Sequence, residues 1–121
     1  METTFRAAIP VLPAIDVGAS LRWWVDVCGF RELFRHGDYA GMQRGDVVMH
    51  LTSVEGAELA RAVGEQTMVR LSVAGIDALY AEFQARGGTV HPNGPLRPQP
   101  WGGRAFAAID PGGVCVTFTE S

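Results

Sequence analysis

The stretch LRWWVDVCG, residues 21–29, decides the fold, because a second stretch with the same pattern follows it at a constant spacing. Apolar residues fall at i, i+3, i+4 and i+7 in the first stretch, which is the period of an amphipathic helix. The second stretch, residues 76–88, repeats this period and also ends in glycine. The matched positions are Leu21 with Leu79, Val25 with Phe83, and Gly29 with Gly87. This repeat predicts two similar modules in one domain, residues 1–121.

Short strands surround each predicted helix. In module one, about residues 1–55, we expect an extended segment at 8–17, a helix with Asp16 as its N-cap, and strands at 31–36, 39–44 and 47–52. In module two, about residues 66–121, we expect a strand at 68–73 before the helix and strands at 89–91, 104–109 and 114–119 after it. The sequence therefore predicts an α+β fold of two βαβββ modules.

The predicted strands alternate between two faces. Val47, Met49 and Leu51 share one side of their strand, and Val48, His50 and Thr52 share the other. One face is expected to pack on the helices, which leaves a semi-polar face that suits a ligand cleft. An insertion at residues 92–103 breaks the repeat and carries four prolines and Trp101. Long irregular loops in compact domains are commonly functional, so the insertion is a candidate binding loop.

Composition excludes several functions. A net charge of −3 argues against a nucleic-acid partner. The sequence shows no apolar run long enough for a membrane helix and no signal-peptide pattern, so we expect a cytoplasmic protein with no membrane partner. All ten cationic residues are arginines, which excludes Schiff-base and P-loop lysine chemistry. Cys28 and Cys115 are expected to be buried thiols, and Trp23 and Trp24 to pack in the core.

Several segments resemble the bleomycin-resistance proteins of the vicinal-oxygen-chelate superfamily, which also includes glyoxalase I, extradiol dioxygenases and fosfomycin-resistance enzymes. These segments are AIPVL (8–12), WWVD (23–26), CGF (28–30), DYAG (38–41), QPWG (99–102) and Asp110-Pro111. The Pro-Trp-Gly stretch is the most specific, and the resemblance covers nearly the whole chain. It implies a bent half-barrel, and a homodimer with ligand clefts between its subunits. It also implies that N-terminal strands can be exchanged between the subunits.

Metal-dependent members of this superfamily place one metal ligand on the first strand and one on the last strand of each module. We assign these positions to Ile9, His50, Met68 and Thr117. Only His50 is a good ligand for a divalent ion. We therefore expect no metal, no other cofactor and no catalytic residues. The alternative is a divalent-metal lyase, dioxygenase or thiol transferase of the same superfamily that relies on His50.

The resemblance places Phe34, Tyr39 and Trp101 where bleomycin-resistance proteins hold the flat bithiazole of the drug between aromatic rings. It thus implies a binding protein, not an enzyme, that sequesters an aromatic, cationic antibiotic such as bleomycin or phleomycin in the dimer cleft. Asp38 and Asp46, which flank the strand of Tyr39, would give that cleft an acidic rim. The predicted ligand-binding residues are Phe34, Asp38, Tyr39, His50, Thr52, Trp101 and Gly103. The alternative for Phe34 and Trp101 is packing in the core, and the alternative for His50 is a structural role in the sheet. The alternative ligand is an unrelated metabolite.

Overall fold

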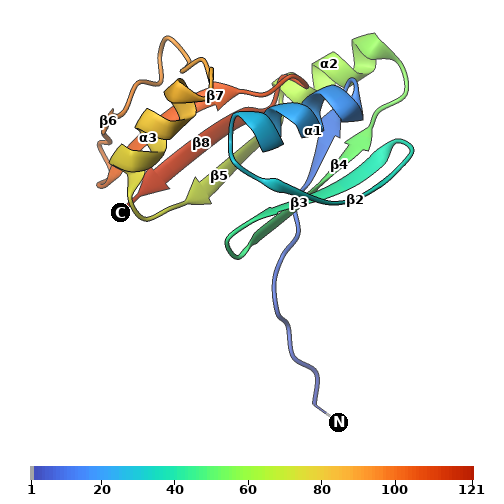
Figure 1. Ribbon diagram of the computed structural model, residues 1–121, viewed down its shortest axis with the longest axis horizontal. Helices are drawn as coiled ribbons and strands as arrows, with labels where there is room; N and C mark the ends of the chain where they lie inside the picture. The colour runs from blue at the N-terminus through green and yellow to red at the C-terminus, as the bar shows by residue number, and fades with distance from the viewer. Residues whose placement is uncertain (1) are drawn as a thin grey trace.

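The computed structural model describes residues 2–121 and contains two four-stranded sheets with three helices (Figure 1). Module one comprises β1 (Val11–Ala14), α1 (Val17–Asp26), β2 (Arg31–His36), β3 (Tyr39–Arg44) and β4 (Val47–Ser53). Helix α2 (Ala57–Glu65) leads into module two. Module two comprises β5 (Met68–Ser72), α3 (Ile76–Ala85), β6 (Arg97–Pro98), β7 (Arg104–Ile109) and β8 (Cys115–Glu120).

The two sheets have the same topology, with strand orders β1-β4-β3-β2 and β5-β8-β7-β6. In each sheet the first strand pairs in parallel with the last strand, and the other pairs are antiparallel. The predicted α+β fold of two βαβββ modules is confirmed. Each sheet remains open, so its outer strands have free edges.

Three details differ from the prediction. Strand β1 is shorter than the expected extended segment, and α2 was not predicted at all. Residues 89–91 form no strand: the His91 N–H donates to the Ala107 carbonyl (2.8 Å), but the Ala107 N–H donates to the Gly94 carbonyl (2.9 Å) and does not return to this segment. The second strand of module two is the two-residue β6 instead, which lies further along the insertion.

The core lies between the helices and the faces of the sheets that they cover. Trp24, Met42 and Met49 are fully buried in module one, and Phe83 and Phe106 are buried in module two. Trp24 therefore packs in the core as predicted, and the partly buried Trp23 contacts Phe83 edge-on across the two modules (6.1 Å).

The two cysteines lie in different environments. Cys28 is buried as expected, and burial raises the pKa of its thiol. The same expectation is wrong for Cys115, which is only half-buried. Its side chain lies on the face of β8 opposite the buried Val116, away from the helices.

Asp110 joins the two modules through a buried carboxylate. Its Oδ1 accepts hydrogen bonds from the backbone N–H groups of Gly112 and Val114, both at 2.9 Å. Its Oδ2 accepts a hydrogen bond from Nε1 of Trp24 on α1, at 3.3 Å. Burial raises the pKa of Asp110, and these hydrogen bonds act in the opposite direction. The turn of module two is thus tied to the first helix of module one.

A second polar link lies nearer the surface of the module junction. Arg44 of β3 donates to both carboxylate oxygens of Glu82 on α3 (2.7 and 3.2 Å) and to the carbonyl of Cys28 (2.7 Å). The hydrogen bond from Arg44 lowers the pKa of Glu82.

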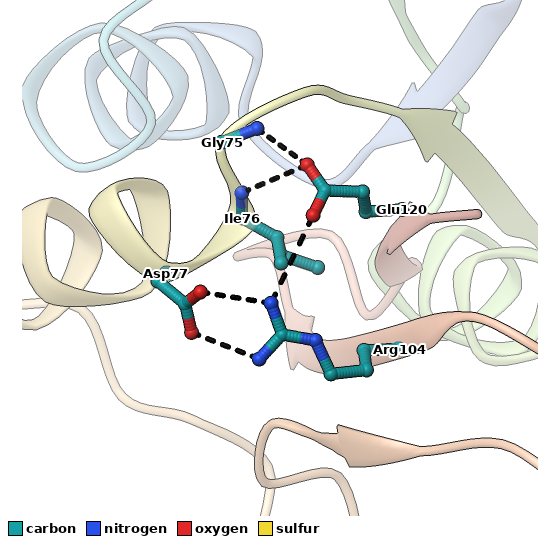
Figure 2. Close-up of polar contacts among 5 residues, drawn as sticks. All are labelled: Gly75, Ile76, Asp77, Arg104 and Glu120. Carbon is teal, nitrogen blue, oxygen red and sulfur yellow. Dashed lines mark hydrogen bonds and ion pairs between the residues drawn. The ribbon is translucent and has the colours of Figure 1, made fainter.

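Helix α3 depends on the C-terminal strand for its N-terminal cap (Figure 2). Its N-cap is Gly75, which has no side chain to offer, whereas α1 is capped by its own Asp16, as predicted. A carboxylate oxygen of Glu120, on β8, accepts hydrogen bonds from the N–H groups of Gly75 and Ile76. Arg104 on β7 pairs with Asp77 in two hydrogen bonds (2.8 and 3.0 Å), which lowers the pKa of Asp77.

Residues 2–10 extend away from both sheets (Figure 1). This arm carries Phe5, whose side chain is 96% exposed. Its last residue, Pro10, accepts a hydrogen bond from the N–H of His50 (2.9 Å). Among residues 2–121, no helix is long and apolar enough to cross a membrane.

We expect Asp110→Ala to lower the free energy of unfolding by about 3 kcal/mol in urea titrations, because three buried donors would lose their acceptor. Asp26→Ala, which removes an exposed carboxylate from α1, should change the free energy by less than about 0.5 kcal/mol. Equal stability of the two variants would show that the Asp110 network does not hold the modules together.

Candidate ligand-binding site

The first sheet presents an aromatic surface on its face opposite α1. The register places Phe34, Gly41, His50 and Val11 in one row across four strands. The next row holds His36, Tyr39, Thr52 and Pro13. Because these side chains point away from the buried Met49 and Leu51, Phe34 does not belong to the core.

Three rings of this surface form a compact cluster. Phe34 and Tyr39 are nearly parallel, with an interplanar angle of 14° and ring centroids 6.2 Å apart. The ring of His50 stands edge-on to both, at 5.2 and 5.3 Å. His50 Nδ1 and Tyr39 Oη share a hydrogen bond of 2.7 Å, which fixes the imidazole relative to the phenol. Gly41 makes this arrangement possible, since a Cβ at that position would overlap the Phe34 ring.

The predicted polar residues lie at the border of this cluster. Thr52 is directly opposite Tyr39 in the register. Asp38 is exposed in the turn between β2 and β3, and its carbonyl accepts a hydrogen bond from the N–H of Ser53 (3.0 Å). Asp46 lies in the turn at the other end of β3. The two acids therefore do not form one acidic rim beside Tyr39, because the length of β3 separates them.

The second sheet presents a different surface on its face opposite α3. Arg70, Thr117 and Ala107 lie side by side across three strands. Trp101, in the Pro-rich loop, is 68% exposed, so it is not a core residue. The guanidinium carbon of Arg70 lies 5.7 Å from the centroid of the indole, within the range of a cation–π contact.

Gly103 has a structural role in this loop. Its carbonyl accepts a hydrogen bond from the N–H of Gln99 (2.9 Å), and the N–H of Gly102 donates to the Gln99 carbonyl (3.0 Å). These bonds close the turn that presents Trp101. Gly103 adopts a φ of +74°, which favours glycine.

The structure therefore divides the predicted site residues between two surfaces. Phe34, Tyr39, His50 and Thr52 lie together on the first sheet, with Asp38 at its border. Trp101 and Gly103 lie in the Pro-rich loop beside the second sheet. A hollow of about 200 Å³ beside Trp101 is lined by Arg70 and Thr117, but by no residue of the aromatic cluster.

A larger hollow of about 560 Å³ lies at the junction of the modules. Cys28, Leu71 and Phe118 line it, together with the Arg44–Glu82 ion pair. Arg44 and Glu82 pair with each other, and Asp46 is the third charged residue of the lining. None of the predicted site residues lines this hollow, so the two sheet surfaces are the candidate binding surfaces.

Arg70 was not predicted as a site residue. The signal was present in the alternation of its strand, because Arg70 has the opposite parity to the buried Leu71 and so lies on the open face of the sheet. A charged residue in the middle of a strand, on the face without helices, is a candidate binding group.

Comparison with known proteins gives the family. Residues 7–118 match the Glyoxalase/Bleomycin resistance protein/Dioxygenase superfamily. The chain is 31% identical over 126 residues to the bleomycin resistance protein of Geobacillus stearothermophilus, covering 93% of this chain and 95% of the relative. The chain belongs to this superfamily, and the predicted resemblance is confirmed.

Solved structures agree with this assignment. The bleomycin-binding protein from the bleomycin-producing Streptomyces verticillus, solved with copper(II)-bleomycin, is 36% identical and superimposes with a TM-score of 0.83, covering 99% of each chain. A bleomycin resistance determinant encoded on transposon Tn5 has the same fold, with a TM-score of 0.81 at 21% identity, covering 97% of this chain and 98% of that one.

The residues at the metal positions of this superfamily do not suit a metal. In the register, His50 lies beside Val11 and Thr117 lies beside Arg70, whereas the predicted positions Ile9 and Met68 are each two residues away. With either choice of first-strand residues, His50 is the one imidazole of the set. Arg70 would contribute a guanidinium, which is not a metal ligand. Within residues 2–121, no three His, Cys, Asp or Glu side chains are grouped to hold an ion.

We expect purified protein to contain far less than one Ni, Zn, Mn or Fe ion per chain in elemental analysis, because His50 is the one good ligand at these four positions. Incubation with a chelator should leave the melting temperature unchanged. A stoichiometric metal that His50→Ala removes would contradict this expectation and restore the enzymatic alternative.

Proposed function

We propose that this protein sequesters an antibiotic of the bleomycin family, in a cleft between the two subunits of a homodimer, without changing it chemically. One observation carries the proposal: a 68% exposed tryptophan is held by a tight turn on the open face of one sheet. A relative that is 36% identical over its full length was solved with copper(II)-bleomycin, which supports this ligand. The two free cysteines agree with a cytoplasmic location.

The division of the site supports the homodimer. The aromatic cluster and Trp101 lie on different sheets of one chain. A two-fold axis that brought the first sheet of one subunit opposite the second sheet of its partner would create two equal clefts. In each cleft Tyr39 or Phe34 of one subunit would face Trp101 of the other. A flat ligand ring between them would then have aromatic contacts on both sides.

Exposed apolar side chains also support the homodimer. Met68, on the open face of β5, is 73% exposed, and Ile109 lies in the same row of the sheet. Phe5 on the N-terminal arm is almost fully exposed. Apolar side chains of this size are stabilised by burial, at roughly 25 cal/mol per Å² of apolar surface. A second copy of the chain would provide that burial.

Sequestration requires binding alone. On the open face of the first sheet, the phenol of Tyr39 shares a hydrogen bond with the imidazole of His50. That pair stands edge-on within the ring cluster, which suits it to shape a binding surface. A protein of this kind lowers the free antibiotic concentration by mass action.

We expect bleomycin to bind wild-type protein with one ligand per chain in isothermal titration calorimetry. Trp101→Ala should weaken binding about 30-fold, or about 2 kcal/mol, because the indole is the central aromatic contact. The melting temperature of this variant should remain close to that of wild type, since Trp101 is outside the core.

Leu59→Ala, which truncates an exposed apolar residue on α2, is the matched control and should leave the affinity unchanged. Unchanged affinity of Trp101→Ala would contradict the stacking role. Absence of bleomycin binding by wild-type protein would leave an unrelated metabolite as the ligand of this fold.

For the assembly we expect light scattering at micromolar concentration to give twice the chain mass of 13.0 kDa. Met68→Glu should shift the protein toward monomer, because it places a charge on the open face of β5. Leu59→Glu places the same charge on α2 and should leave the dimer intact. A monomeric wild-type protein would rule out the cleft between subunits.

A further inference from the structure

The hollow beside Trp101 is rich in hydrogen-bond donors. It is lined by two arginine side chains (Arg70 and Arg97), two side-chain amides (Asn93 and Gln99) and the hydroxyl of Thr117. Among the described residues, 2–121, no aspartate or glutamate lines it. The lining therefore offers an excess of positive charge and donors over a volume of about 200 Å³.

The charge of these two arginines is not neutralised within the chain. Neither guanidinium lies within 4 Å of a carboxylate oxygen of residues 2–121. Arg97 donates to the carbonyl of Asn93 (2.9 Å), which is a neutral acceptor. By contrast, Arg44 and Arg104 each form a close ion pair with a carboxylate. Arg70 and Arg97 therefore keep their charge available to a ligand.

Trp101 contacts Arg70, one of these two arginines. Its indole also offers a flat surface on which an aromatic ring can stack. The Arg70 guanidinium lies over the indole, 5.7 Å from its centroid, and Thr117 lies next to Arg70 in the register. Trp101 is 68% exposed, so the part of the indole surface beside Arg70, on the side of the hollow, is open to an aromatic ligand. A group attached to that ring would then reach the guanidinium, whose planar fork matches the two oxygens of a carboxylate.

We propose that this hollow is an oxyanion subsite, and that the protein binds planar aromatic carboxylates with the ring on Trp101 and the carboxylate on Arg70. The subsite goes beyond the sequestration of a cationic antibiotic, because it adds a ligand class of opposite charge. It also gives the cleft a polarity. The end near Trp101 is cationic, while Asp38 lies by the aromatic cluster on the other sheet.

The test compares two probes of the same shape, 2-naphthoate and its neutral amide, 2-naphthamide, by isothermal titration calorimetry at low salt. Wild-type protein should bind the carboxylate at least tenfold more tightly than the amide. Added sodium chloride should reduce this preference, because the arginines are partly exposed. Arg70→Met should abolish the preference, since it keeps the apolar stem but removes the donors and the charge. Trp101→Ala should weaken both probes.

The matched control is Arg61→Met, which removes an exposed arginine from α2 and should keep the tenfold preference. Melting curves of each variant will show that it is folded. Equal affinity of wild type for the two probes, binding of neither, or a preference that survives in Arg70→Met would each overturn the oxyanion subsite. Bleomycin is titrated in parallel: if it binds in a Trp101-dependent manner while 2-naphthoate does not, the subsite fails and the sequestration function stands.

Discussion

The buried carboxylate of Asp110 is the interaction on which the arrangement of the two modules depends. A carboxyl group away from water must have its acceptors filled, and three N–H donors from two modules fill them here. Close backbone packing adds to this constraint, because a Cβ at Gly112 would meet the carbonyl of Pro13, and one at Gly64 would overlap the carbonyl of Gly112. These contacts therefore fix the position of the turn at residues 110–113 relative to α1, β1 and α2. Because these elements pack on the sheets, their placement also sets the direction in which each open sheet face points.

Two modules with one topology have acquired different chemistry on their open faces. The rows that carry Phe34, Tyr39 and His50 in the first sheet correspond to rows that carry Arg70 and Thr117 in the second. The first face offers rings and one imidazole, and the second offers donors and a single exposed indole. A ligand with a flat centre and polar ends would use both faces. In the proposed homodimer, the first sheet of one subunit and the second sheet of the other would let one ligand contact both faces.

Periodicity in the sequence predicted most of the fold. Helices α1 and α3 have strong apolar stripes, and β2 to β4 alternate with the two-residue period that also groups Phe34 with His50. Helix α2 was missed because the residues that it buries, Ala60 and Gly64, are small, while its larger apolar residues, Leu59 and Val63, are exposed. The strand expected at residues 89–91 failed because the Ala107 N–H bonds to Gly94 and not to this segment. The contact between Arg70 and Trp101 could not be predicted, since an irregular loop carries no period from which to place its side chains.

The resemblance found in the sequence assigns the metal-ligand positions of this superfamily to the first and last strands of each module. In module two, the residues that lie there are of a different kind. In this chain the same strands of module two bring Arg70 beside Thr117. A guanidinium presents a fixed positive charge and several donors at that place, but it offers no open coordination position and cannot generate hydroxide from water. Arg70 therefore attracts oxygen-rich groups without metal coordination, which agrees with the proposed role of a protein that binds its ligand and releases it unchanged.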